Sequence, residues 1–413
     1  MPVPRQAAAQ GRAATWRGTN PEVSVMAIVR KDRVLLVVLS DRLSGLIEKG
    51  EITPRYYNPG ELFHEVHLLL TNDDAPDTKI LQETVGGARL FVHNLPAGRS
   101  LFWKSACWRP RLLRNWALSG VEMARRIRPD VIRCYGNNLN GFLAAQMRRA
   151  LGTPLVISLH VNADEDLRGR AKTFSERLLS YAALGIEEES LRAADLVLPV
   201  YEPIVPYLEK RRIAPYRVCY NFLNATDIRR KSDYRIRSNA KLIGVGRQFA
   251  AKNPRNVLSA LKELPGVSLT LVGNGPLHGE LRSLAAKSGL GGRVVFVPRM
   301  ENDALCRSLP EYDLFVAHSE FFEIGKAVLE ALLAGLPVVI NRRQGRPVPE
   351  FRDGVVRLVP DSPEGYLSGI RTLLANEEAR RQLGTTAWTV AQGKYAPAVT
   401  EAVYAKVYRS FLN

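Results

Sequence analysis

Short, continuous apolar runs alternate with longer helical patterns along this chain, and this alternation constrains the fold more than any other feature. The runs of the first half are residues 33–39, 66–70, 131–134, 155–159 and 195–200. Those of the second half are residues 241–245, 268–272, 293–297, 313–317 and 337–340. Runs of this kind are typical of strands buried on both faces of a parallel sheet. The sequence therefore predicts an α/β fold with two Rossmann-like, doubly wound parallel-sheet domains facing a central cleft, where such folds bind ligands.

Changes of composition suggest where the domains begin and end. The 413 residues suit two such domains, at 31–223 and 241–394. The polar, basic stretch 224–240 is expected to link them. A final helix is expected within 395–413, and packing of this helix on the first domain is left open. The first 25 residues lack the apolar core of a secretory signal, so 1–30 is expected to be a flexible tail. A transit peptide and a start at Met26 remain open alternatives.

The chain is strongly basic, with a net charge of +17. The segment from Arg99 to Arg128 contains eight Lys and Arg residues but a single acidic residue, Glu122, and three tryptophans are interleaved with the cations. This composition indicates peripheral contact with an anionic membrane, although a solvated helix face is an equal alternative. Nucleic acid is a further option but is not the expected partner. The four cysteines are scattered singly, which indicates a reducing compartment and favours a cytoplasmic location, with the inner face of the membrane left open.

Two glycine turns and two cations mark a candidate anion site in the second half. Gly246 and Arg247 follow one strand, and Lys252 lies five residues after Arg247 on a loop. Fixed cations at this position suit a diphosphate leaving group, which gathers negative charge as its bond to a sugar breaks. The turn Gly273-Asn274-Gly275 follows the next strand. Surface cations on a helix start are the plainer alternative.

A loop that enters a helix near Gly325 is a second candidate site. A helix start offers free backbone N–H groups to a phosphate, and glycine lets the ligand approach. Glu330 is unusual because it stands inside the apolar run 327–334, where a carboxylate requires a partner. A ribose diol is a suitable partner, and a nearby Arg or Lys is the alternative.

The ordered motifs resemble the retaining GT-B glycosyltransferases of family 4. The motifs are Val245-Gly246-Arg247 with Lys252, the run 271–277, the strands 293–296 and 313–316, and Gly325 with Glu330. The resemblance implies that Arg247 and Lys252 bind the donor diphosphate, Glu330 binds the ribose, and backbone near Pro298 and Arg299 meets the base. It also implies a nucleotide-diphosphate sugar donor, a glycan or lipid-linked acceptor and no metal cofactor. The remaining expected donor contacts are Gly246, Gly273, Asn274, Gly275, Ile324, Gly325 and Lys326.

The chain departs from the family pattern at two points. The family places a glutamate where Phe322 stands, so Glu323 is expected to replace it, and Glu320 is the alternative. After the strand at 337–340, the usual glycine pair is replaced by a stretch that contains Arg342, Arg343 and Arg346. These cations are expected either to contact an acidic acceptor or to be solvated.

The first half is expected to bind the acceptor. Tyr135 stands where the family commonly has a histidine, so His160, at the end of another strand, is the preferred catalytic candidate. A satisfied core histidine is the alternative for His160. Asn137 and the Ser44-Gly45 pair are further acceptor-side candidates.

Other functions remain possible for the same motifs. The triplet Asp164-Glu165-Asp166 matches an Asp-x-Asp metal motif, but metal binding is not expected. A phosphorylase, an epimerase or a non-catalytic binding protein could share the two-domain fold. The expected catalytic residues of a transferase are Arg247, Lys252, Glu323 and His160.

Overall fold

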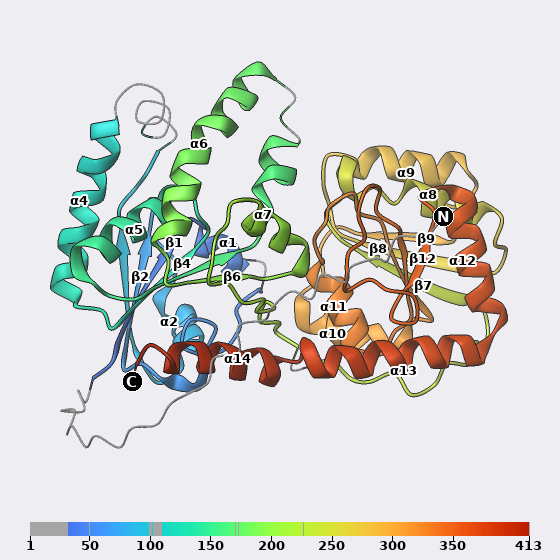
Figure 1. Cartoon of the computed structure of the whole chain (residues 1–413). Coiled ribbons are helices and arrows are strands. Elements are labelled where there is room, and N and C mark those ends of the chain that lie inside the picture. Colours follow the sequence, from blue (N-terminus) through green and yellow to red (C-terminus); the bar gives the residue numbers. More distant parts are fainter. Residues whose placement is uncertain are drawn as a thin grey trace, which may run out of the picture. The chain divides into compact units, whose positions relative to one another are not determined.

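The computed structural model describes residues 32–48, 50–98, 101, 110–169, 171, 173–225 and 227–412. The expected tail at 1–30 lies outside these residues. The described chain forms two six-stranded parallel sheets with helices on their faces (Figure 1). The predicted architecture of two doubly wound α/β domains is confirmed.

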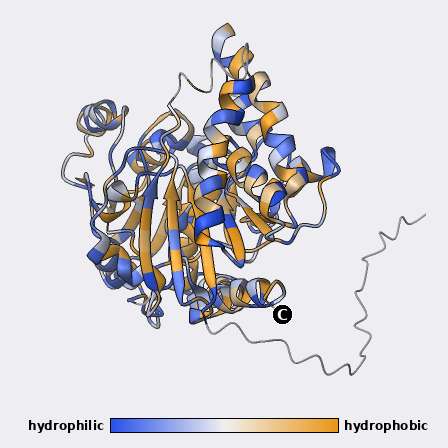
Figure 2. Ribbon diagram, turned by 90° about the vertical axis from the view of Figure 1, so that its left-hand side faces the viewer, coloured by the Kyte–Doolittle hydropathy of each residue, from blue (hydrophilic) through white to orange (hydrophobic). Residues whose placement is uncertain are grey.

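The first sheet has the strand order β3-β2-β1-β4-β5-β6. Its strands are β1 (Val34–Leu39), β2 (Glu65–Leu70), β3 (Arg89–Asn94), β4 (Val131–Tyr135), β5 (Leu155–Leu159) and β6 (Leu196–Pro199). The register places Val37 opposite Leu68 of β2 and opposite Arg133 of β4. The apolar side chains of the central strands are buried, and these strands are largely orange in Figure 2. Burial on both faces explains why these segments read as continuous apolar runs.

Helices on both faces cover this sheet. They are α1 (Leu43–Glu48), α2 (Thr78–Leu81), α4 (Pro110–Ile127), α5 (Leu139–Leu151), α6 (Phe174–Ala193) and α7 (Val205–Lys210). Gly120 lets α4 approach α5 closely, because a Cβ there would lie 2.6 Å from the Leu143 side chain. Short turns add η1 (Pro59–Glu61), η2 (Gln82–Val85), η3 (Asp164–Arg168) and η4 (Glu202–Ile204).

The second sheet repeats the same topology, with the order β12-β11-β10-β7-β8-β9. Its strands are β7 (Ala240–Val245), β8 (Val267–Val272), β9 (Val294–Val297), β10 (Leu314–Ala317), β11 (Val338–Asn341) and β12 (Arg357–Val359). In each sheet the strand order reverses beside the first strand, between β1 and β4 and between β7 and β10. Ligands of doubly wound sheets bind at this reversal, outside the carboxyl ends of the strands.

The helices of the second half include one that packs on the first sheet. The helices are α8 (Arg255–Lys262), α9 (His278–Lys287), α10 (Asn302–Ser308), α11 (Lys326–Leu333), α12 (Pro363–Ala375), α13 (Glu377–Lys394) and α14 (Pro397–Arg409), with the turns η5 (Ala250–Lys252) and η6 (Leu309–Glu311). On α14, Tyr404, Val407 and Tyr408 are buried in the same core cluster as β1 and β2. Glu401 pairs with Arg55 at 2.9 Å. The last helix therefore lies against the first sheet.

The polar stretch expected to link the domains is anchored to the second half. Lys231 is buried, its backbone N–H donates to the carbonyl of Ala334 at 2.8 Å, and its Nζ donates to the carbonyl of Pro310 at 2.9 Å. Burial lowers the pKa of Lys231. Tyr234 is also buried and donates to the carbonyl of Gly335. Part of this stretch is therefore fixed by packing.

Candidate active site

The two glycine turns that follow β7 and β8 pack backbone against backbone. A Cβ on Gly273 would lie 2.1 Å from the carbonyl oxygen of Gly246, and one on Gly275 would lie 2.2 Å from that of Gln248. Gly273 also has a φ of +128°, which favours glycine. The carbonyl of Asn274 accepts from the N–H of Gln248 at 2.9 Å. The expected donor residues Gly246, Gly273, Asn274 and Gly275 are thus brought together, with open space beside Gly246.

Lys252 and Glu323 form a close ion pair at the edge of this space. Lys252 ends η5, and its Nζ lies 2.6 Å from Oε1 of Glu323. Both side chains are partly exposed, at 25% and 32%. Arg247 is exposed, and its guanidinium lies 5.7 Å from the ring of Phe249. Glu320 is exposed, and its backbone N–H donates to the carbonyl of Ala251.

A buried polar network fixes the loop that carries Glu323. Asn341, at the end of β11, accepts from the N–H of Ser319 at 3.0 Å and donates to its carbonyl at 3.1 Å. Arg343 donates to the carbonyls of Phe321 and Asn341 at 2.7 and 2.9 Å. Burial lowers the pKa of Arg343 to about 10. The expectation that Arg343 is solvated or contacts an acceptor is therefore wrong, because it supports the loop from inside.

The other two arginines of this stretch are more accessible. Arg342 is exposed and lies 3.6 Å from Asp353. Arg346 stacks on Phe322, with 4.7 Å between its guanidinium and the ring, and donates to the carbonyl of Pro203 at 2.7 Å. Phe322, at the position where the family has a glutamate, thus packs against a cation.

Glu330 lies on the inner face of α11, as the apolar run around it predicts. Gly325 is the N-cap of this helix, and Ile324 before it is buried in the core. Glu330 is 4% exposed, and its Oε1 accepts from Nδ2 of Asn302 at 2.9 Å. Burial raises the pKa of Glu330. Glu330 takes part in none of the ion pairs found among the described residues, and Asn302, which the sequence did not suggest, supplies one hydrogen bond.

Pro298 and Arg299, expected near the nucleobase, follow β9 and are both exposed. Arg299 donates to the carbonyl of Glu48, at the end of α1, and pairs with Glu301 at 2.9 Å. The guanidinium of Arg299 therefore contacts protein groups, while residues Pro298 and Arg299 are themselves exposed.

A pocket opens at the carboxyl ends of β1, β4 and β5. Tyr135, His160, Tyr56 and Lys326 are among its lining residues. The rings of Tyr135 and His160 lie 5.8 Å apart. Lys326, the first residue of α11, pairs with Glu51 at 3.2 Å. Two of the acceptor-side candidates, Tyr135 and His160, thus share a pocket with Lys326, an expected donor residue.

His160 presents a buried ring nitrogen without a hydrogen-bond partner. Its Nε2 is inaccessible to solvent and has no partner in the structure. Burial, with smaller contributions from Arg133 and Lys326, lowers the pKa of His160 to about 4. His160 is therefore neutral near pH 7, and the alternative of a fully satisfied core histidine does not describe it.

Arg133, below this pocket, was not suggested by the sequence. It is fully buried, donates to the Ser158 hydroxyl and lies 5.1 Å from the Tyr135 ring and 5.0 Å from the Tyr404 ring. Its Nε and Nη1 have no hydrogen-bond partner. This positive charge contributes to keeping His160 neutral.

Ser44 and Asn137 have protein partners instead. The Ser44 hydroxyl and N–H donate to Asp74 at 2.5 and 2.9 Å. Burial opposes ionisation of Asp74, but these hydrogen bonds outweigh it and lower the pKa. Asn137 donates to the Tyr207 hydroxyl at 3.0 Å. Gly45 has open space beside it, since a Cβ there would meet no atom within 4 Å.

Asp164, the first residue of the Asp-x-Asp triplet, forms ion pairs with three cationic side chains. It accepts from Arg168 at 2.7 Å, Lys210 at 3.2 Å and Arg211 at 2.6 Å. Burial opposes its ionisation, but the bonds from Arg211 and Arg168 hold the pKa well below its usual range. Asp164 therefore acts in an internal ion network.

Sequence comparisons agree with this architecture. Residues 228–389 match the model of the family described as glycosyl transferases group 1, and residues 60–221 match the glycosyl transferase 4-like domain. Sulfoquinovosyl transferase SQD2 of Arabidopsis thaliana is 30% identical over 65% of this chain and 54% of its own length. The lipopolysaccharide core biosynthesis glycosyltransferase LpsE of Rhizobium meliloti is 30% identical over 39% of this chain and 47% of its own length. The matches thus span about half the length of these relatives.

Structural comparison gives the same fold. The Anabaena HepE protein in complex with UDP and glucose has a TM-score of 0.67 and 18% identity, over 92% of this chain and 100% of that chain. The two adjacent family matches cover the second sheet and every strand of the first sheet except β1. Together with the structural comparison, they show that the chain belongs to the group 1 glycosyltransferases and has the GT-B fold.

Proposed function

We propose that this chain transfers a sugar from a nucleotide-diphosphate sugar to a hydroxyl acceptor, with retention of anomeric configuration. The observation that carries the proposal is the pairing of Lys252 with Glu323 immediately before α11, the helix that also carries buried Glu330. Two carboxylates, one for the sugar and one for the ribose, thus lie along one loop and helix, and Lys252 of η5 brings a cation for the diphosphate to that loop. The HepE protein, which has the same fold, was solved in complex with UDP and glucose, and this supports a nucleotide sugar as the donor.

The donor would lie between the glycine turns and the start of α11. Arg247 and Lys252 would meet the diphosphate, and the free backbone N–H groups after Gly325 would add partial positive charge. These groups stabilise the leaving diphosphate more strongly as its charge develops. Glu330, oriented by Asn302, would accept hydrogen bonds from the ribose hydroxyls. The backbone at Pro298 and Arg299 would meet the base.

The acceptor would enter the pocket lined by Tyr135 and His160. Its hydroxyl oxygen attacks the anomeric carbon on the face that the phosphate leaves, the bond to the phosphate oxygen breaks, and that oxygen takes the acceptor proton. Neutral His160 and Tyr135 would hydrogen-bond the acceptor or the sugar, and catalysis would come mainly from positioning and charge stabilisation. NMR of the product would show the retained anomer, and an inverted product would refute this route.

The reaction is proposed to need no metal cofactor. The Asp-x-Asp triplet is a poor metal site because Arg168, Lys210 and Arg211 already occupy the Asp164 oxygens. Turnover that persists in excess chelator is the expected result, and loss that Mg²⁺ or Mn²⁺ restores would contradict it.

A calorimetric screen of nucleoside diphosphates, followed by sugar-nucleotide turnover with and without hydroxyl acceptors, tests the proposal. A phosphorylase or epimerase would release or rearrange the sugar without an acceptor, and a binding protein would show affinity without turnover. The family match and the paired Lys252 and Glu323 favour the transferase. A nucleic-acid ligand would instead show binding that falls steeply with salt.

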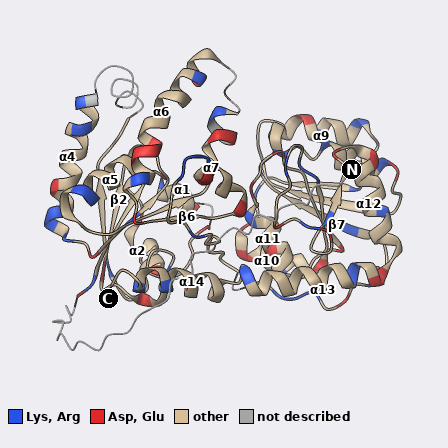
Figure 3. Ribbon diagram, in the orientation of Figure 1, with Lys and Arg blue, Asp and Glu red and all other residues tan. Residues whose placement is uncertain are grey.

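Peripheral membrane contact through the basic segment 99–128 is part of this proposal. Its described part forms α4, where exposed cations are visible in Figure 3, and Arg111, Arg114 and Arg125 line a groove with Arg149 of α5. Trp116 packs partly against the core, whereas Trp103 and Trp108 lie outside the described residues. Within the described chain, no helix has both the length and the apolar character needed to span a bilayer.

A further inference from the structure

The first turns of α6 carry an exposed apolar stripe that the proposed reaction does not use. Phe174, Leu178 and Tyr181 are 83%, 49% and 64% exposed. Spacings of four and three residues place them on one face of the helix. These turns extend beyond the neighbouring helices of the first sheet (Figure 1). Large apolar side chains grouped in this way indicate a contact surface.

A capping box begins α6, so the stripe lies on regular helix. The Thr173 hydroxyl accepts from the N–H of Glu176 at 3.2 Å, and the Glu176 carboxylate accepts from the N–H of Thr173 at 3.0 Å. This capping box fixes the first turn. It also holds the Glu176 charge at the helix start, away from the apolar face.

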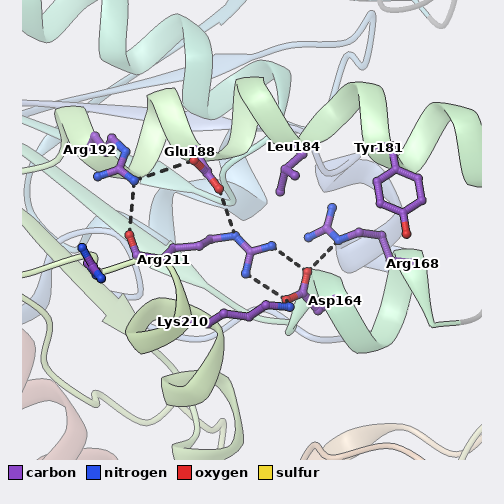
Figure 4. Close-up of a pocket in the computed structure, with 9 residues that line it drawn as sticks. Asp164, Arg168, Tyr181, Leu184, Glu188, Arg192, Lys210 and Arg211 are labelled. Carbon is purple, nitrogen blue, oxygen red and sulfur yellow. Dashed lines mark hydrogen bonds and ion pairs between the residues drawn. The ribbon is translucent and has the colours of Figure 1, made fainter.

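A basic pocket continues directly from the stripe, and Tyr181 belongs to both (Figure 4). The cations that line it are Arg168, Arg192, Lys210, Arg211 and Arg212. Two carboxylates, Asp164 and Glu188, face these five cations. The pocket therefore carries a surplus of positive charge.

The surplus lies at the exposed rim of the pocket. Arg168 and Arg211 are almost buried and bind Asp164, and Arg168 also binds buried Glu187 at 2.8 Å. Lys210 pairs with Asp164 at 3.2 Å and Arg192 with Glu188 at 3.7 Å, but their side chains are still 71% and 57% exposed, and Arg212 is exposed as well. The inner ion network thus holds the pocket in shape, while the rim cations are accessible to an anion.

We propose that the α6–α7 surface, formed by the apolar stripe and this basic pocket, docks the protein on an anionic membrane. The three apolar side chains would enter the interfacial region of the bilayer, and the rim cations would contact lipid phosphates. Three side chains at the end of one helix are too few for a stable protein interface, which needs about 800 Å² from each partner. The cationic rim favours an anionic lipid surface over a neutral one.

The position of α6 connects this surface to the acceptor side. The helix follows β5, so its first turn lies at the carboxyl edge of the first sheet, where His160 lines the acceptor pocket. Docking through α6 turns this edge toward the bilayer. A lipid-linked acceptor would then lie within reach of the acceptor pocket. This consequence rests on the proposed sugar transfer, but the docking does not depend on that transfer.

Flotation of the full chain with vesicles of phosphatidylcholine, with and without phosphatidylglycerol, tests the docking independently of activity. The wild type should float only with phosphatidylglycerol. The triple variant Phe174→Ser/Leu178→Ser/Tyr181→Ser should lose about tenfold or more of this partitioning. Lys210→Gln/Arg212→Gln should weaken it and reduce its salt dependence. Val295→Ser, at a 58% exposed apolar residue of β9, should leave it unchanged.

Phe174→Trp provides a second measurement, since brominated lipids should quench its fluorescence more strongly than that of the wild type. Wild-type flotation by the correctly folded triple variant would overturn the proposal. Loss of flotation in Arg111→Gln/Arg114→Gln, combined with no change in the triple variant and in Lys210→Gln/Arg212→Gln, would assign the docking to α4 alone and would also overturn the proposal. The triple substitution could instead convert a dimer to a monomer in ultracentrifugation while flotation is retained. That result would show that the stripe contacts a second copy of the chain, and it would also overturn the docking proposal.

Discussion

The Nζ atom of Lys252 lies 2.6 Å from Oε1 of Glu323, so the cation after β7 and the carboxylate before α11 meet beyond the carboxyl ends of the adjacent strands β7 and β10. Phe322, where a glutamate was expected, stacks under Arg346. The network of Ser319, Asn341 and Arg343 holds this loop with Glu323 facing Lys252. We therefore propose that Glu323 acts for the carboxylate that the family pattern has one residue earlier.

The first prediction separates the two candidate glutamates. Glu323→Gln should lower kcat by about a hundredfold, since it removes a charge placed to face the reacting sugar. Glu320→Gln is the matched control and should retain near-normal turnover. Sugar-nucleotide turnover under saturating donor measures both variants. A larger loss in Glu320→Gln would reverse the assignment.

The second prediction concerns the diphosphate. Arg247→Ala and Lys252→Ala should each lower kcat by about 10²- to 10³-fold, because each removes a cation aimed at developing charge. Arg255→Ala offers a control, since its exposed guanidinium pairs with Glu280 on the nearby α9. Circular dichroism should show intact folds. Near-normal rates in both variants would exclude the phosphate role.

The third prediction concerns the ribose. Glu330→Gln should weaken nucleoside diphosphate binding by about tenfold, equivalent to ~1.4 kcal/mol. Its free energy of unfolding should not fall, because burial already disfavours the charged form and raises the pKa of Glu330. Calorimetric titration and thermal unfolding measure the two effects. A variant that loses stability but binds nucleotide normally would make Glu330 a structural residue.

The sequence predicted ten of the twelve strands in the described chain, because each of these ten carries a continuous apolar run. It did not predict β3 and β12, which lie at the sheet edges. The side chains of β3 are exposed or partly exposed along its whole length, and β12 has only three residues. The other two edge strands, β6 and β9, keep continuous apolar runs and were predicted. The exposure of β3 and the shortness of β12, rather than edge position alone, therefore explain why apolar periodicity does not mark them.

The site could be predicted where its residues lie close together in the sequence. Lys252, Gly325 and Glu330 stand on turns and helix starts whose local pattern is visible. Asn302 and Arg343 could not be found in this way, because their partners are contributed by distant segments of the fold. Arg343 also stands within the polar run 341–346, which resembles a surface loop and conceals its burial.

The fourth prediction tests the inner support of the Glu323 loop. Arg343→Ala should cost about 2–4 kcal/mol of unfolding free energy, because it leaves buried carbonyls of Phe321 and Asn341 without a donor. It should also lower kcat, since Glu323 would be held less firmly. Arg342→Ala is the matched exposed control and should change neither quantity. Denaturant unfolding and turnover provide the measurements, and an Arg343→Ala protein as stable as wild type would contradict the supporting role.

The fifth prediction concerns the pH dependence of stability. His160 has a pKa lowered to about 4 in the folded chain, below the value of about 6.5 expected when unfolded. The unfolded state therefore binds more protons between these values, so stability is fully present above pH 6.5 and is lost as pH falls toward 4. At pH 5 the loss from this group should be ~2 kcal/mol relative to pH 7. The glutamine of His160→Gln does not titrate, so between pH 7 and pH 5 the unfolding free energy of the variant should fall by ~2 kcal/mol less than that of the wild type. His67 and His93 are present in both proteins and contribute equally to both. Denaturant unfolding at pH 7 and pH 5 measures the difference, and identical pH dependence of the two proteins would show that the ring of His160 is not held neutral.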